Sequence, residues 1–202
     1  ILRVVRFYAN KKPCITALTD NIIPHEKRLG DVAFSRYFAH SSYDFVVMSR
    51  SVGTEIEQAL GQKAVAQRRS SSTAAPVRFA PHPVYDIYGS PLPAEAARSA
   101  LQLPQKVPVI LFFGLIRAYK GLDIFLEALA RLPGVHALVA GECYEDWATY
   151  QALADRHGLA DRLHVHLRFI PSEEVRNYFC AADLLVQPYK TATQSGISQI
   201  AY

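Results

Sequence analysis

Apolar runs of strand length alternate with amphipathic segments of helix length along the second half of the chain. Such alternation predicts repeated strand–helix–strand units built on a parallel sheet. The predicted strands are residues 107–113, 135–140, 163–167 and 184–187. The predicted helices are residues 94–101, 122–132 and 147–157, one with Ser172 as its N-cap, and one that begins at Ile197. We therefore expect a doubly wound α/β domain in this half.

The first half of the chain shows the same kinds of element in a less regular pattern. The predicted strands are residues 15–18, 45–48 and 77–80. The predicted helices are residues 32–40, with Asp31 as N-cap, and a segment from Ser49 or Ser51 to Leu60. Prolines then cluster between residues 81 and 93, and a stiff segment of this kind suits a connection between domains. The sequence thus predicts one α/β domain over residues 1–80, a linker over 81–93 and a second domain over 94–202.

Polar loops follow each predicted strand of the second domain. Because ligands of open parallel sheets bind beyond the carboxyl ends of the strands, these loops are expected to share one binding edge. The loops are residues 114–120, 141–145, 168–171 and 189–196. Their convergence supports a binding site more strongly than any single motif does.

The loop after the strand at residues 107–113 has the composition of an anion site. Gly114 ends the strand, Arg117 and Lys120 follow, and Gly121 precedes a predicted helix. The free N–H groups and positive dipole end of a helix favour an anion, an arginine can bind phosphate through two parallel bonds, and a lysine adds a point charge. Basic residues and glycines also occur in ordinary strand–helix connections, and the spacing alone favours neither interpretation.

Composition narrows the function classes further. The chain of 202 residues has a formal net charge of +4, which favours anionic partners without requiring nucleic acid. Its apolar runs are all shorter than the roughly 18 residues that predict a membrane span. Cys14, Cys143 and Cys180 are scattered, as is typical of reduced cytoplasmic thiols. His164 and His166 alternate with apolar residues and favour one face of a strand over a metal site, so we predict no metal.

Several motifs, taken together, resemble those of the family 4 retaining glycosyltransferases. In that family's order they are residues 113–122 (Phe-Gly-Leu-Ile-Arg-Ala-Tyr-Lys-Gly-Leu), 140–142 (Ala-Gly-Glu), 181–184 (Ala-Ala-Asp-Leu) and 187–189 (Gln-Pro-Tyr), with residues 24–26, 48–52 and 81–86 also fitting upstream. The resemblance spans essentially the whole chain. It implies a GT-B architecture, in which two Rossmann-like domains face each other across a cleft, with both sheets incomplete in this chain. It also implies that the first domain takes the acceptor and the second a nucleotide-diphosphate sugar, without a metal or a cofactor.

The resemblance also implies roles for individual residues. Arg117 and Lys120 would pair with the donor diphosphate and stabilise the charge on the leaving group, where other enzymes use a divalent metal. His25 and Glu26 would act near the acceptor, with plain polar loop residues as an equal alternative. The remaining candidates are Gly114, Gly121, Glu142, Gln194, Ser195, Gly196 and Gln199 on the donor side and Asp20 and Asn21 on the acceptor side.

Two departures from the family pattern affect individual assignments. The family places two glutamates around the last turn, whereas nothing acidic lies between Asp183 and Tyr202, so Gln194 or Gln199 would make the ribose or sugar contact unless it is lost. Many members also have a histidine where this chain has Asp20, which would accept a hydrogen bond from a sugar hydroxyl but would not replace an imidazole. Glu142 would meet the nucleotide or the donor sugar, with an ordinary acid before a helix as the alternative.

The leading hypothesis is a hexosyltransferase that moves a sugar from a nucleotide-diphosphate sugar to a glycan or lipid-linked acceptor with retention, as in polysaccharide biosynthesis. The alternatives are a nucleotide-sugar epimerase of the same architecture, which would form product from the donor alone, and a non-catalytic nucleotide-sugar-binding module. The chain begins and ends inside elements of the family fold, so we expect weak donor binding, little turnover and self-association through incomplete sheet edges. For the basic residues Arg3, Arg6, Lys11 and Lys12, peripheral contact with an anionic membrane is an alternative to simple solvation.

Overall fold

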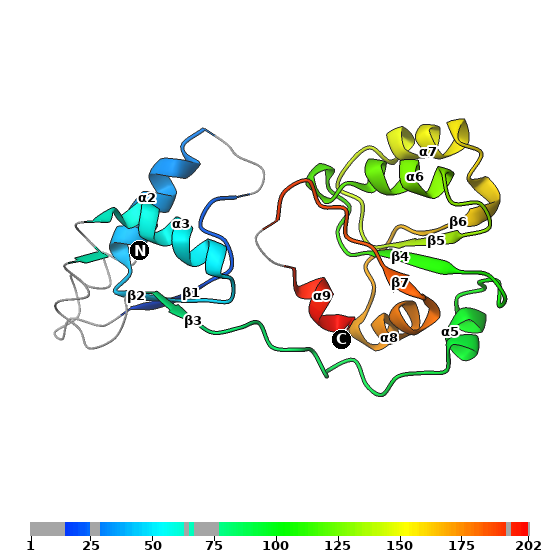
Figure 1. Cartoon of the computed structure of the whole chain (residues 1–202), viewed down its shortest axis with the longest axis horizontal. Helices are drawn as coiled ribbons and strands as arrows, with labels where there is room; N and C mark the ends of the chain where they lie inside the picture. Colours follow the sequence, from blue (N-terminus) through cyan, green and yellow to red (C-terminus); the bar gives the residue numbers. More distant parts are fainter. Residues whose placement is uncertain (1–14, 25–28, 63–64, 67–76, 193–194, 202) are drawn as a thin grey trace. The chain divides into compact units, whose positions relative to one another are not determined.

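The computed structural model divides the chain into two compact units (Figure 1). Unit 1 contains residues 1–83 and 192–194, and unit 2 contains residues 84–191 and 195–202. The structure describes residues 15–24, 29–62, 65–66, 77–192 and 195–201. Each unit has its own parallel sheet and its own hydrophobic core.

Unit 1 is built on a three-stranded parallel sheet in the order β1-β2-β3. The strands in the described part of the unit are β1 (Thr16–Thr19), β2 (Asp44–Val47) and β3 (Val77–Phe79). Its main described helices are α2 (Asp31–Ser41) and α3 (Arg50–Leu60). Ala39 of α2 and Ile56 of α3 share one core with Phe45 of β2, and all three side chains are inaccessible to solvent. Both helices therefore depend on the apolar face of β2.

The start of helix α2 differs from the prediction. Gly30 occupies the N-cap position with a left-handed backbone (φ 98°), and Asp31 is the first helical residue. The prediction that Asp31 is the N-cap is therefore wrong. Glycine adopts positive φ without the steric cost that a Cβ would bring, so the chain can turn into the helix one residue earlier.

Unit 2 contains a four-stranded parallel sheet in the order β6-β5-β4-β7. The strands are β4 (Val109–Phe113), β5 (His136–Ala140), β6 (Leu163–His166) and β7 (Leu184–Leu185). The two central strands, β4 and β5, are apolar throughout apart from His136, as expected for strands that are covered on both faces. The predicted alternation of strands and helices and the parallel α/β class are thus confirmed for this half of the chain.

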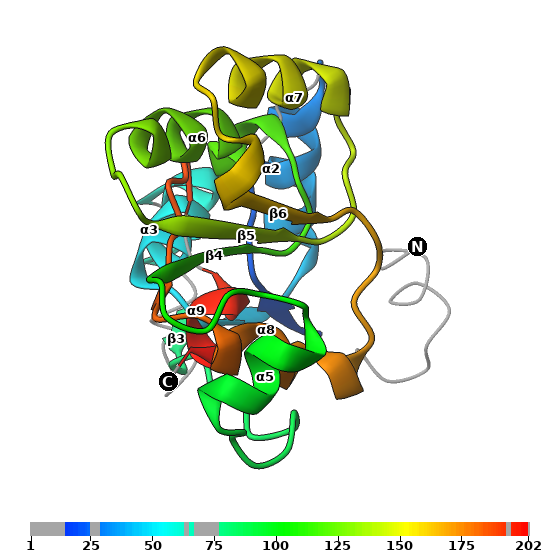
Figure 2. The same ribbon diagram turned by 90° about the vertical axis from the view of Figure 1, so that its right-hand side faces the viewer.

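Helices cover both faces of the unit 2 sheet (Figures 1 and 2). On one face lie α6 (Leu122–Ala130) and α7 (Trp147–Arg156), and on the other lie α5 (Ala94–Ala100) and α8 (Ser172–Ala181). Short 3-10 turns, η1 (Ala118–Lys120) and η2 (Ala160–Arg162), and a final helix α9 (Gly196–Ile200) complete the described part of the unit. The sheet is thus the middle layer of three.

The sequence pattern explains why α6 packs as it does. Leu122, Phe125, Leu126 and Leu129 recur at helical spacing, and each is at most 1% exposed. Helix α8 confirms the predicted start region but not its cap, because Pro171 occupies the N-cap position and Ser172 is already helical. No side-chain hydrogen bond caps this helix, so acids in its first turn provide the favourable interaction with the dipole.

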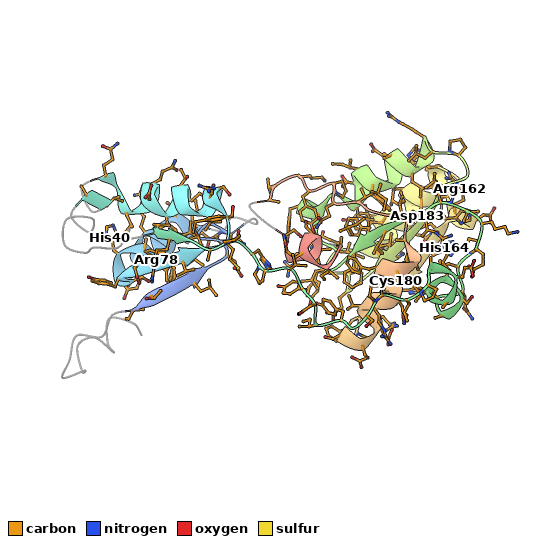
Figure 3. The ribbon with its side chains drawn as sticks, turned by 60° about the horizontal axis from the view of Figure 1, so that its bottom comes forward. His40, Arg78, Arg162, His164, Cys180 and Asp183 are labelled. Atoms are coloured by element: carbon orange, nitrogen blue, oxygen red, sulfur yellow. The ribbon has the colours of Figure 1, made fainter. Side chains whose placement is uncertain are left out.

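The two histidines of β6 lie along one strand face, as predicted (Figure 3 labels His164). His164 Nε2 lies 3.1 Å from Nδ1 of His136 on the neighbouring strand, and His166 Nδ1 lies 2.9 Å from the Tyr178 hydroxyl of α8. Burial is the main reason that the pKa values of these three histidines are lowered. Within the described part of the chain, no group of three or more His, Cys, Asp or Glu residues is placed to hold a metal ion.

A buried arginine connects α5 to the amino ends of β4 and β7. Arg98 is 7% exposed, and its guanidinium donates to the carbonyl oxygens of Ala181 (2.9 Å) and Gln105 (2.8 Å). It also donates to Asp183 Oδ2 (2.8 Å), which in turn accepts from the Val109 N–H at the start of β4 (2.7 Å); Asp183 is labelled in Figure 3. This network lies at the amino ends of the strands, opposite the predicted binding edge. It connects helix α5 to β4 and to the chain that precedes β7.

Replacing Arg98 by Met should therefore destabilise unit 2, because carbonyl acceptors and a carboxylate lose their donor together. We expect a loss of about 3 kcal/mol in the free energy of unfolding. Urea unfolding followed by the fluorescence of Trp147 measures this, since the chain has one tryptophan and it lies on α7 of unit 2. Arg156→Met, at an exposed position of α7, is the matched control and should change little.

Candidate functional site

The candidate site lies at the carboxyl ends of β4, β5 and β7 in unit 2. The backbones leaving β4 and β5 stay hydrogen-bonded beyond the strands: Gly114 N–H donates to Ala140 (2.9 Å) and Ile116 N–H donates to Glu142 (2.8 Å). Tyr144 N–H then donates back to the Ile116 carbonyl (3.1 Å). The loops after the two strands are thus held side by side, and the residues that follow Ile116 have a fixed starting point.

Glycines permit the backbones to approach closely at this edge. Gly141 has φ 140°, and a Cβ there would lie 2.2 Å from the Gly114 carbonyl oxygen. Gly121 has φ 72°, and a Cβ there would lie 2.2 Å from the Pro188 carbonyl oxygen. At both positions the backbone has a φ that is unfavourable for other residues, and an added Cβ would clash with the backbone of a neighbouring loop. The loop before α6 therefore packs directly against the chain leaving β7.

Lys120 places a buried ammonium at the centre of this edge. The residue is only 8% exposed, and a Cβ on Gly114 would lie 3.2 Å from its Nζ. Its Nζ lies 5.6 Å from the ring centroid of Tyr189, a cation–π contact. Among the described residues no carboxylate forms an ion pair with it. Asp123, the acid in the first turn of α6, is paired instead with Lys190 at 2.7 Å.

The environment of Lys120 disfavours its positive charge. Burial lowers the pKa of the Lys120 ammonium, and the nearby Arg117 guanidinium lowers it further. Arg117 is half-buried, and its guanidinium carbon lies 4.8 Å from the ring centroid of Tyr144. The edge therefore holds two repelling cations supported by aromatic rings. An anion placed between the cations would relieve this repulsion.

The loop that carries these cations is anchored from the β5 side. The Glu145 carboxylate accepts a hydrogen bond from the Ala118 N–H (3.1 Å), at the start of η1. The Lys190 N–H donates to the Tyr119 carbonyl (2.7 Å), which ties the same turn to the loop after β7. The turn between Arg117 and Gly121 is thus held at both sides by the neighbouring loops.

A polar cluster after β7 borders the two cations. Gln187 donates from Nε2 to Ser195 Oγ (2.7 Å) and to the Tyr189 hydroxyl (3.1 Å), and its Oε1 accepts from Ser198 Oγ (2.6 Å). Ser195 is the N-cap of α9, and Ile197 of α9 contacts the Gly114 turn, 3.4 Å from where its Cβ would lie. The start of α9 and the Lys120 ammonium therefore approach the same glycine.

The structure brings some of the predicted site residues together and separates others. Gly114, Arg117, Lys120 and Gly121 lie with Ser195 and Gly196 at the edge of unit 2. Glu142 follows β5 at the same edge and is half-buried. The backbone carbonyl of Gln199 accepts a hydrogen bond from the backbone N–H of Tyr85 (3.2 Å), near the start of unit 2. Asp20 and Asn21 directly follow β1 and belong to unit 1. The predicted residues His25, Glu26 and Gln194 lie outside the described residues.

Sequence reasoning missed the side chains that hold the cations. Tyr144 and Tyr189 face Arg117 and Lys120, and Gln187 organises the hydroxyls behind them. A usable signal existed, because Tyr144 and Tyr189 follow predicted strands at the carboxyl edge and Gln187 is the last residue of one. Aromatic residues in such loops are usually interpreted as packing residues. No short motif links a tyrosine to a lysine far away in the sequence, so the contact is not predicted.

Comparison with solved structures defines the class of fold. The Anabaena protein HepE, solved in complex with UDP-glucose, superposes with a TM-score of 0.73 at 20% identity, over 94% of this chain and 50% of its own. WaaG, a glycosyltransferase involved in lipopolysaccharide biosynthesis, superposes with a TM-score of 0.66 at 16% identity, over 97% of this chain and 58% of its own. The chain has the GT-B fold, as predicted, and spans about half the length of these proteins.

Sequence comparison then identifies the family. The chain belongs to the family Glycosyl transferases group 1, whose model matches residues 93–198. The D-inositol 3-phosphate glycosyltransferase of Mycolicibacterium smegmatis is 36% identical over 115 residues, 53% of this chain and 26% of that protein. The Mycobacterium bovis enzyme of the same name is 40% identical over 101 residues, 46% of this chain and 20% of that protein. The predicted membership of a glycosyltransferase family is confirmed.

Replacing Lys120 by Met should stabilise the free protein near neutral pH. The folded state lowers the pKa of Lys120 below its ordinary value of 10.5, so the protonated form costs folding free energy that an apolar side chain avoids. This cost is fully present below the lowered pKa and disappears as pH rises towards 10.5, because the folded lysine then becomes neutral. The gain in unfolding free energy of Lys120→Met should accordingly shrink between pH 7 and pH 9.5.

Urea unfolding at the two pH values measures this difference directly. Lys106→Met, at an exposed position, is the control for the loss of a lysine charge and should change the free energy of unfolding little. A stabilisation that stays the same at both pH values would contradict the electrostatic cause.

Replacing Gly121 by Ala should cost far more stability than replacing Gly134 by Ala. Both glycines have similar positive φ values, 72° and 78°, so both substitutions carry the same backbone strain. At Gly134 nothing lies within 4 Å of the added Cβ, whereas at Gly121 the Pro188 carbonyl lies in its way. We expect about 1 kcal/mol for Gly134→Ala and at least about 3 kcal/mol for Gly121→Ala. Equal losses in urea unfolding would show that the contact with the chain after β7 carries no energy.

Proposed function

We propose that unit 2 binds the diphosphate of a nucleotide sugar at its carboxyl edge, and that the chain contributes the donor half of a retaining glycosyltransferase. The observation that carries the proposal is the pair Arg117 and Lys120. Arg117 is half-buried and Lys120 almost fully buried, both lie on a glycine-bounded turn, and each contacts a tyrosine ring. Among the described residues, no carboxylate forms an ion pair with Lys120. Buried positive charge at a sheet edge favours a highly charged anion.

The two cations suit the chemistry of the leaving group. When a sugar leaves a nucleotide-diphosphate donor, negative charge builds up on the departing phosphate oxygen. Cations already held in place stabilise that charge without reorganising, which is the main way in which a site lowers such a barrier. Arg117 supplies two parallel N–H donors and Lys120 a point charge, so together they would do what a divalent metal does in other enzymes.

A structural neighbour supports the proposed class of donor. HepE is solved in complex with UDP-glucose, and the two curated relatives are named for transfer to D-inositol 3-phosphate. We infer a nucleotide-diphosphate hexose as donor, with retention, no metal and no cofactor, in the cytoplasm. A glycan or lipid-linked acceptor, as in polysaccharide biosynthesis, would be taken by unit 1. Asp20 and Asn21 at the carboxyl end of β1 are the described candidates there, with His25 and Glu26 proposed beside them.

No helix among the described residues has the length and apolar character that a bilayer crossing requires. Contact with a lipid-linked acceptor at the membrane surface is part of the proposal. Self-association through the edges β6 and β7 of the unit 2 sheet is a further expectation, which gel filtration would test.

Calorimetric titration of the full chain with UDP, GDP and ADP tests the proposal. We expect at least one of them to bind, and Arg117→Ala and Lys120→Ala each to weaken binding about tenfold or more, because each removes a charge-assisted hydrogen bond worth about 1.5–3 kcal/mol. Arg131→Ala removes the same charge from an exposed position beyond the other end of α6 and should leave binding unchanged.

Two results would contradict the proposal. The first is no binding of any of the three nucleotides to the unmodified chain, which would favour a module that does not bind nucleotides. The second is an equal loss in Arg131→Ala, which would reduce the effect to overall charge. Incubation with the UDP-, GDP- and ADP-sugars without acceptor separates a transferase from an epimerase, since the epimerase alone would convert the donor.

A further inference from the structure

The Gln187 side chain forms three hydrogen bonds, all with hydroxyl groups of the chain after β7. Its two amide hydrogens are directed to Ser195 Oγ (2.7 Å) and to the Tyr189 hydroxyl oxygen (3.1 Å), and its carbonyl oxygen accepts from Ser198 Oγ (2.6 Å). The chain just before it is fixed, because Val186 N–H donates to the Leu111 carbonyl of β4 (2.8 Å). The amide is therefore held at the end of a strand and fixes the positions of three hydroxyl groups.

This arrangement determines where the hydroxyl hydrogens point. The oxygens of Tyr189 and Ser195 each accept a hydrogen from Gln187, so each keeps its own hydrogen for another acceptor. The two oxygens lie 3.4 Å apart, so one of these hydrogens can bridge them. Among the described residues, the second hydrogen has no other acceptor. The cluster thus offers at least one hydroxyl donor to a ligand.

The cluster lies beside the Lys120 ammonium. The Tyr189 ring centroid is 5.6 Å from Lys120 Nζ, and Ile197, two residues after Ser195, contacts the same Gly114 turn as Lys120 does. Tyr189 and Ser195 are half-buried, so a ligand at this edge reaches their hydroxyls. A hydroxyl hydrogen next to a buried cation is a suitable pair of donors for a phosphate oxygen.

We propose that Gln187 is a positioning residue that turns the Tyr189 and Ser195 hydroxyls into donors for the phosphate oxygens of a bound nucleoside diphosphate. Tyr189 and Ser195 touch the ligand, whereas Gln187 acts through them. This inference rests on the proposed function of the same edge, and it adds two side-chain contacts and one residue behind them to the paired cations.

The test compares nucleotide binding in variants of the full chain, with UDP, GDP and ADP as probes. Gln187→Met keeps the volume of the side chain and removes its donors and acceptor, and we expect affinity to fall about tenfold. The double variant Tyr189→Phe with Ser195→Ala should show a similar fall, because it removes the hydroxyls that Gln187 orients. Adding Gln187→Met to that double variant should cause no further loss.

This last comparison separates orientation of the hydroxyls from support of the fold. If Gln187 merely stabilised the loop, its replacement would weaken binding as much in the double variant as in the unmodified chain, and that result would overturn the proposal. Gln151→Met is the matched control, since Gln151 also uses its amide in side-chain hydrogen bonds, on α7, and should leave affinity unchanged.

The same series of variants distinguishes three outcomes: misfolding of a variant, failure of the proposed function, and failure of the role proposed for Gln187. If Gln187→Met does not fold, as judged by Trp147 fluorescence, the single variants Tyr189→Phe and Ser195→Ala decide, and unchanged affinity in both would overturn the proposal. If no nucleotide binds the unmodified chain, the proposed function itself fails. If Arg117→Ala weakens binding while Gln187→Met, Tyr189→Phe and Ser195→Ala do not, only the role of Gln187 is refuted.

Discussion

Close backbone contact between the chains leaving β4, β5 and β7 is the constraint on which the rest of unit 2 depends. Two glycines make this contact possible. A Cβ on Gly141 would clash with the carbonyl oxygen of Gly114, and a Cβ on Gly121 would clash with that of Pro188. With the loops in contact, a side chain on one loop has aromatic and polar partners on the others. The cations, rings and hydroxyls of the candidate site come from distant parts of the sequence. They are neighbours because the loops that carry them are in direct backbone contact.

The stabilising partners of the cations are unusual for buried charge. A buried lysine is ordinarily paired with a carboxylate, which would leave the site neutral and closed to an anionic ligand. Here Lys120 and Arg117 contact the faces of Tyr189 and Tyr144, and Asp123 in the first turn of α6 is bound to Lys190. An aromatic face attracts a cation without neutralising it. The fold thus pays in stability for the charge of Lys120, and burial accordingly lowers the pKa of its ammonium.

Much of this fold could be predicted from the sequence, because its signals are local. The apolar runs of β4 and β5 and the helical spacing of Leu122, Phe125, Leu126 and Leu129 each place an element without knowledge of its neighbours. The edge where strand ends meet also followed from the topology of parallel sheets. Helix starts were less certain: Gly30 and Pro171 occupy the cap positions that a pattern of polar residues assigned to Asp31 and Ser172. At both sites backbone conformation outweighed the side-chain preference.

The candidate site was predicted only in part, since its remaining residues are defined by contacts across the sheet. Arg117 and Lys120 were found because a glycine-bounded turn after a strand indicates an anion. The roles of Tyr144, Tyr189 and Gln187 depend on which loops touch, and this is a property of the assembled edge. The pairing of Asp123 with Lys190 has a kinetic consequence. With that acid neutralised, the field at the start of α6 stays positive, so a phosphorylated ligand would be drawn in over about one Debye length, roughly 10 Å at 0.1 M salt. Its capture rate, more than its residence time, would then respond to the ionic strength of the surroundings.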